Sequence, residues 1–169
     1  MADITIRHEF DCDEETFWEK CIFSRDFNTQ LYKGVLKFHA YDTLSDSNEP
    51  TRRTKKVRVE PALGNLPAAA KKVIGEKLAY TEEGALDKAT GRYTFTVTPS
   101  VLEGKVKTGG ELRCEKLGPN KIARVVQIHV EAKLPLIGGI IEEKIIGDLR
   151  RSYETAGEFT REWLKTHAS

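Results

Sequence analysis

The segment KLPLIGGIIEEKIIGDL, residues 133–149, decides the fold. Its first half is an apolar run interrupted by a proline and by Gly138 and Gly139, and its second half has the spacing of an amphipathic helix. Glycine has no Cβ, so this pair allows a sharp turn from a strand into a helix. Leu136 and Ile137 stand in a connection that would normally be polar. They must therefore be covered by protein or contact something apolar.

The helix predicted from residue 139 onward is long and has one apolar face, which must pack across a second layer. Gly147 and Gly157 lie inside this helix, and each costs about 1 kcal/mol relative to alanine. Such glycines mark either a close approach by another element or a tolerated solvent-facing position, and the sequence leaves both interpretations open. The apolar face comprises Ile141, Ile145, Leu149, Tyr153, Ala156, Phe159 or Thr160, and Trp163.

Most of the remaining chain is predicted to form strands. Residues 3–10 alternate so that Ile4, Ile6, His8 and Phe10 share one face, which indicates a half-buried strand. Two short helices follow, and a third is predicted within residues 61–75. Most strands are joined by short turns, so the sheet is predicted to be antiparallel. The further strands are predicted at residues 35–44, 51–60, 78–86, 93–98, 104–117 and 121–134.

Composition indicates a single globular domain over residues 1–169. The formal net charge of +1 gives no reason to expect a nucleic-acid partner. Three cysteines without C-x-x-C spacing fit a reducing compartment, although one disulfide is not excluded. The N-terminal residues have no apolar signal region, and no apolar run is long enough to span a membrane. We therefore expect a soluble, cytoplasmic protein.

The order of elements resembles the helix-grip fold of the START-like superfamily, also called the Bet v 1-like or SRPBCC superfamily. Within it, the chain resembles a bacterial family known as domain of unknown function 2505. The resemblance depends on ITIRHEF, on DEETFWEKC, on KLPLIGGIIEEKI and on a final helix that ends EFTREWL. It implies an α+β fold: a curved antiparallel sheet of about seven strands wrapped around a long C-terminal helix, with two short helices after the first strand. It also implies a cavity between sheet and helix, which in the superfamily often binds lipids, sterols or other hydrophobic molecules.

Strand alternation and the helical face predict the lining of that cavity. His8 and Arg124 fall on inward-facing positions and would supply its polar groups. An inward arginine needs a partner, because an unpaired buried charge is costly. Arg124 would meet the polar head of a ligand, or reach solvent at the strand end, which is the interpretation that we favour. The apolar and aromatic lining is predicted to be Phe38, Tyr93, Phe95, Val126, Ile128, Leu149 and Tyr153, with Leu136, Ile137, Gly138 and Gly139 as a gate or cavity end, or as ordinary core at a tight corner.

No catalytic motif or closely spaced pair of metal ligands is present, and alternation places His8 inward but His39 and His129 outward. We predict no metal, cofactor or catalytic residue. TRRTKKVR, residues 51–58, is the strongest basic run. Each cation near an anionic surface adds about 1 kcal/mol, so transient membrane contact is one interpretation. The other, which we favour, is an edge strand that its charges protect against aggregation.

The sequence therefore predicts a protein that binds or carries a hydrophobic small molecule, with a lipid as the expected ligand. Two alternatives stay open. One is a protein-interaction module with a collapsed cavity, and the other is an enzyme that acts on an apolar substrate in the same cavity. Fold alone does not decide among them.

Overall fold

The computed structural model describes residues 2–62, 64, 66–75 and 77–167. Within that part of the chain, seven strands form one antiparallel sheet in the order β1-β7-β6-β5-β4-β3-β2. The predicted strand number and orientation are confirmed. The strands are β1 (Ala2–Phe10), β2 (Ala40–Asn48), β3 (Arg52–Glu60), β4 (Tyr80–Asp87), β5 (Arg92–Pro99), β6 (Val106–Gly118) and β7 (Lys121–Ala132).

Two short helical segments connect β1 to β2, and each begins at a side-chain cap. Asp13 accepts a hydrogen bond from the backbone N–H of Thr16, and Ser24 accepts one from that of Phe27. These oxygens satisfy backbone donors that have no partner within the first helical turn. The first segment comprises α1 (Glu14–Phe17) and η1 (Trp18–Ile22), and the second comprises α2 (Arg25–Thr29) and η2 (Gln30–Val35).

The strand predicted at residues 35–44 is wrong in its first half. Helix η2 runs to Val35, Lys37 adopts a φ of 59°, and β2 begins only at Ala40. The positive φ breaks the alternation that the sequence pattern assumed, so Tyr41 is buried rather than solvent-facing. Phe38 consequently lies before the strand, where its ring packs 5.5 Å from that of Tyr32.

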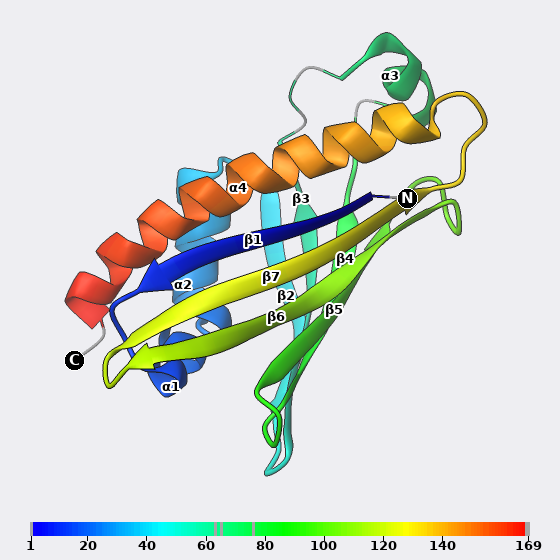
Figure 1. The fold of residues 1–169 in the computed structure, drawn as a ribbon. Helices are drawn as coiled ribbons and strands as arrows, with labels where there is room; N and C mark the ends of the chain where they lie inside the picture. The colour runs from blue at the N-terminus through cyan, green and yellow to red at the C-terminus, as the bar shows by residue number, and fades with distance from the viewer. Residues whose placement is uncertain (1, 63, 65, 76, 168–169) are drawn as a thin grey trace.

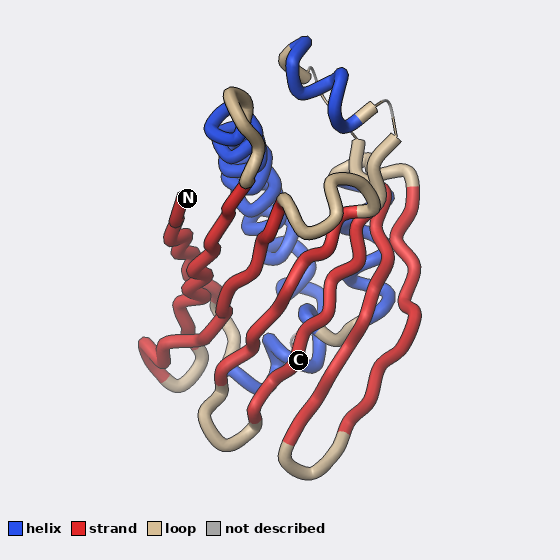
Figure 2. The backbone as a smooth tube through the Cα atoms, turned by 90° about the vertical axis from the view of Figure 1, so that its right-hand side faces the viewer, coloured by secondary structure: helices blue, strands red, loops and turns tan. Residues whose placement is uncertain are grey.

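Helix α4 (Gly138–His167) lies along the sheet and confirms the predicted C-terminal helix. It packs on β1, β7 and η2, and it runs beside β1 in Figure 1, while the sheet curves away towards β2. Figure 2 shows α4 on one side of the sheet and α3 (Ala68–Ile74) beyond the end of the strands. Ala70 of α3 shares a small core with Ile141 at the start of α4.

The basic run lies inside the sheet, because β3 pairs with both β2 and β4. The predicted edge strand is therefore wrong, and the edges are β1 and β2. Alternation with the buried Val57 and Val59 turns Arg53 and Lys55 towards the side of the sheet that carries α4. None of the helices in the described part of the chain is long and apolar enough to cross a membrane.

Candidate functional site: a tyrosine-rich interior around Glu82

The interior is tightly packed under α4 and more open over the middle of the sheet. Val126 and Ile128 of β7 are almost fully buried, at 0% and 2% exposure. On the central strands, by contrast, Tyr80, Glu82 and Val97 keep accessible surface although alternation turns them to the same side. Since α4 packs on β1 and β7, the accessible part of the interior lies over β4 and its neighbours.

All five tyrosines of the chain gather in this interior, and they come from five different elements. Tyr32 stacks on Tyr41 with ring centroids 4.6 Å apart, and Tyr80 packs in the same small core. Tyr93 reaches across β4, because a Cβ built on Gly84 would lie 1.8 Å from its hydroxyl oxygen. The absence of a side chain at Gly84 is therefore what admits that ring. Tyr153 approaches from α4.

Glu82 lies on β4 between Tyr80 and Gly84 and on the same face of the sheet. Burial raises the pKa of its carboxyl above the ordinary value, although the positive charge of Lys55 opposes the shift. The negative charge of Glu82 in turn adds to burial in raising the pKa of every one of the five tyrosines. On the strand itself, Tyr80 lies two residues before Glu82 on the same face, and Tyr93 reaches Gly84 two residues after it.

These polar groups are unusually short of partners. In the described part of the chain, neither Glu82 nor any of the five tyrosine hydroxyls makes a hydrogen bond or an ion pair. The Tyr93 hydroxyl is buried as well as unpaired. Buried polar groups in folded proteins are nearly always satisfied, so the Tyr93 hydroxyl calls for water or a ligand, whereas Glu82 and the other four hydroxyls keep accessible surface. An acid whose pKa is raised in such surroundings is a candidate for a functional site.

A second polar group, formed by His8, Arg124 and Glu154, lies where β1, β7 and α4 meet. Arg124 donates from Nη2 to His8 Nδ1 at 2.9 Å, and His8 Nε2 lies 3.2 Å from a Glu154 carboxylate oxygen. Arginine can only donate, so Nδ1 is the acceptor and the imidazole proton is on Nε2, which donates to Glu154. Burial, and then the charge of Arg124, lower the pKa of His8. The imidazole is therefore held neutral between a cation and an acid.

Arg124 is 4% exposed and points inward, so the solvent-facing interpretation is wrong. Its guanidinium lies 5.1 Å from the Phe10 ring centroid and 5.2 Å from that of Tyr153, and its Nε is buried without a partner. Burial lowers its pKa. Aromatic faces stabilise a cation in this position, and Tyr153 connects this group to the tyrosines around Glu82.

The structure places the predicted lining residues in different parts of the protein. Tyr93, Phe95, Val126 and Ile128 belong to the buried core, and Leu149 packs partly buried against it. Phe38 lies apart from them, beside Tyr32 and Tyr41. Tyr93 and Tyr153 are the predicted residues that reach the Glu82 group. Whether any of these side chains contacts a ligand stays a prediction.

The residues of the predicted gate segment likewise differ in burial. Gly138 is buried, and a Cβ there would lie 2.4 Å from the carbonyl oxygen of Ala132, so only glycine fits this corner. Ile137 packs partly buried in the small core with Ile141. Leu136 is fully exposed at a φ of 71°. Its leucine side chain is thus held in solvent by a strained backbone, which is a feature of functional loops.

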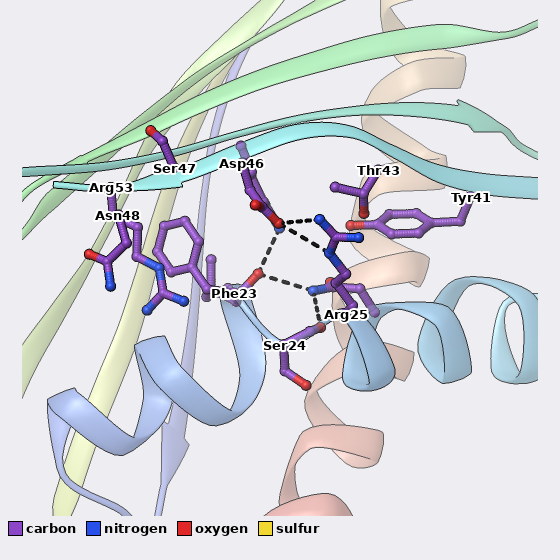
Figure 3. Close-up of a pocket in the computed structure, with 12 residues that line it drawn as sticks. Phe23, Ser24, Arg25, Tyr41, Thr43, Asp46, Ser47, Asn48 and Arg53 are labelled. Carbon is purple, nitrogen blue, oxygen red and sulfur yellow. Dashed lines mark hydrogen bonds and ion pairs between the residues drawn. The ribbon is translucent and has the colours of Figure 1, made fainter.

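A pocket of about 110 Å³ opens between the short helices and β2–β3. In Figure 3, Phe23, Tyr41 and Arg53 surround it, and Arg25 is bonded to Asp46 across it. Lys55 also lines it. None of the predicted lining residues does. Tyr41 and Lys55 therefore belong both to this pocket and to the surroundings of Glu82.

Sequence reasoning missed Glu82, Lys55, Tyr32 and Tyr41. The signal for Glu82 was present in YTEEG, where alternation puts Tyr80, Glu82 and Gly84 on one face. No group of three potential metal ligands occurs among the residues that the structure describes, and all three cysteines are free thiols.

The curved sheet, the long C-terminal helix and the short helices after β1 form the START-like, or Bet v 1-like, fold. Residues 5–164 match the family described as "Protein of unknown function (DUF2505)", and the chain belongs to that family. The predicted fold and the predicted family are both confirmed. No curated protein matches the sequence.

Solved structures share the fold at low sequence identity. TTHA0849 from Thermus thermophilus is 15% identical with a TM-score of 0.65, and the match covers 99% of this chain and 100% of that one. A START superfamily protein from Mycobacterium smegmatis is 18% identical with a TM-score of 0.62, covering 96% and 98%. Norcoclaurine synthase from Thalictrum flavum, solved with dopamine and hydroxybenzaldehyde, is 13% identical with a TM-score of 0.60, covering 95% and 87%.

Proposed function

We propose that the protein binds a hydrophobic small molecule between α4 and the central strands of the sheet. The observation that carries this proposal is the cluster of Glu82 and five tyrosine hydroxyls, which make no hydrogen bond in the described part of the chain and lie beside an apolar core. Ligand sites are mostly apolar with a few polar groups that orient the ligand. The norcoclaurine synthase structure holds small aromatic molecules, which supports the proposal by analogy of fold.

The ligand that this interior favours is amphiphilic. A plain hydrocarbon chain would leave Glu82 and the tyrosine hydroxyls without partners, which is costly in a buried site. A lipid with a polar group meets the requirement, and so does a smaller aromatic molecule with hydrogen-bonding substituents. We place binding before catalysis because Glu82 has no hydrogen-bonded acid or base beside it in the described part of the chain, and His8 is held by Arg124 and Glu154. A cytoplasmic location stays a prediction.

Mass spectrometry of small molecules released from gently purified protein tests the proposal, beside a mock preparation. A matched pair of variants then locates the site. Val97 pairs with Glu82 and keeps accessible surface inside, whereas its neighbour Thr96 is exposed on the outer face. Val97→Trp should fill the space and reduce ligand occupancy, and Thr96→Trp should not. Equal occupancy in the two folded variants would place the ligand elsewhere, and a wild-type protein that carries no ligand and takes none up would favour the interaction module.

Transient membrane contact is the second part of the proposal, and Leu136 rather than the basic run now supports it. The exposed Leu136 and Ile140 lie at the end of the molecule that also carries α3 (Figure 1). Exposed Lys133, Lys71 and Lys72 accompany them. Apolar tips with surrounding cations match the surface of an anionic bilayer, from which a hydrophobic ligand would be taken.

A further inference from the structure

Glu82 occupies a position in which a carboxylate is destabilised unless something pairs with it. It lies on β4 opposite Val57 of β3 and Val97 of β5, so its two cross-strand neighbours on the inner face are apolar. It makes no hydrogen bond or ion pair within the described chain, yet its surface is still accessible. An unpaired charge in such surroundings is stabilised by a bound partner of opposite charge.

The nearest cation of the protein does not fill that role. Lys55 lies diagonally across from Glu82 on β3, where it pairs with Gly84. Its ammonium donates to the carbonyl oxygen of Ile22 at 2.7 Å, and it lies 5.9 Å from the centre of the Phe23 ring. The lysine therefore points towards η1, and no ion pair joins it to Glu82. Arg124 is likewise held by His8.

The tyrosines add a second element of cation recognition. Tyr80 lies two residues from Glu82 on the same face of β4 and packs with Tyr32 and Tyr41. Tyr93 lies against Gly84, two residues along the strand on the other side, and Tyr153 comes from α4. Aromatic faces attract a cation, and phenolic oxygens can accept additional N–H bonds. The same interior already holds the Arg124 guanidinium between two aromatic rings.

We propose that Glu82 and the surrounding tyrosines form a subsite for a protonated amine carried by the hydrophobic ligand. This inference rests on the proposed function and specifies its ligand. An ammonium group compensates the carboxylate charge and supplies several donors to a group of unpaired acceptors. A neutral hydroxyl would supply one donor and no charge, and an anionic group would add a second negative charge beside Glu82.

Four single-ring probes test the charge preference, since they share one skeleton: benzylamine, benzyl alcohol, toluene and benzoate. A single ring suits the adjacent pocket of about 110 Å³. Affinities are measured by NMR chemical-shift titration of the purified full chain at neutral pH. We expect benzylamine to bind more tightly than benzyl alcohol, and benzoate to bind most weakly.

Three variants test whether Glu82 is responsible for the preference for benzylamine. Glu82→Gln should weaken benzylamine about 10- to 100-fold and leave toluene almost unchanged. Glu83→Gln is the matched control, because Glu83 is the exposed neighbour on the outer face and pairs with Lys56. It should leave all four affinities unchanged. Lys55→Met removes a positive charge near the subsite and should strengthen benzylamine binding.

The outcomes separate this inference from the function on which it rests. If toluene and benzyl alcohol bind but benzylamine has no advantage, or if its advantage survives Glu82→Gln, the amine subsite is refuted and hydrophobic binding stands. If none of the four probes binds, the proposed function itself is contradicted and the subsite with it. Glu82→Gln removes an unpaired charge, so its melting temperature should be equal to or above that of the wild type, which separates lost binding from lost folding.

Discussion

Replacing Gly157 by alanine tests the contact between α4 and His8, and Gly147→Ala in the same helix is its control. A Cβ at Gly157 would lie 2.9 Å from His8 Cδ2 and 3.2 Å from Nε2. A Cβ at Gly147 would meet nothing nearer than the end of the Arg151 side chain, at 3.5 Å. The two substitutions are chemically identical and differ in what the new methyl group contacts.

Both variants gain helix propensity, and only one creates a clash. Alanine is about 1 kcal/mol more favourable than glycine in a helix interior, so Gly147→Ala should stabilise the protein by about that amount. The His8 ring cannot move aside freely, because Arg124 and Glu154 hold its two nitrogens. Overpacking of this kind costs about 1–3 kcal/mol. Gly157→Ala should therefore be about 1–3 kcal/mol less stable than Gly147→Ala.

Thermal and urea denaturation of the two variants and the wild type measure the difference. For a chain of this size, 1 kcal/mol corresponds to about 2–4 °C in melting temperature, so the variants should melt several degrees apart, with the wild type between them or close to Gly157→Ala. NMR of the His8 ring should show a shifted resonance only in Gly157→Ala. Equal stabilisation by both alanines would refute the close packing of His8 on the helix.

Further predictions concern His8, Arg124 and Leu136. Burial and Arg124 lower the pKa of His8 in the folded protein below its ordinary value of 6.5. As pH falls, the unfolded chain therefore takes up a proton at His8 before the folded protein does. The neutral His8 should contribute its full share to the free energy of unfolding above pH 6.5, and that share should be lost as pH drops from 6.5 to the lower folded pKa. Urea titrations across this range should show that dependence, and a His8→Gln variant should show less of it. Arg124→Met removes the charge that disfavours imidazolium, so NMR titration should find a higher His8 pKa than in the wild type. Leu136→Gly relieves the left-handed strain and should stabilise the fold by about 1 kcal/mol, yet weaken co-sedimentation with anionic vesicles; unchanged vesicle binding would remove the membrane contact from the proposal.

The fold was predictable because its two strongest signals are local. The period-2 alternation of β1, β5 and β7 and the helical spacing after Gly139 each appear within one element. Both failures depend on information that is not local. Lys37 takes a positive φ although nothing in its own identity requires it, and β3 is interior although its composition is that of an exposed edge. Pairing order is decided by the whole sheet, not by one strand.

The site was less predictable, because alternation gives the face of a residue and not its distance from the opposite layer. Val126 and Glu82 are both inward-facing, but Val126 belongs to β7, on which α4 packs, and Glu82 lies farther along the sheet, on β4. The first position is packed and the second keeps accessible surface. The lining was predicted from strand alternation and the helical face, and neither pattern shows how close α4 lies to each strand. Glu82 and Tyr80 instead lie on β4, where the sheet curves away from the helix, and that is where an amphiphilic ligand would find partners.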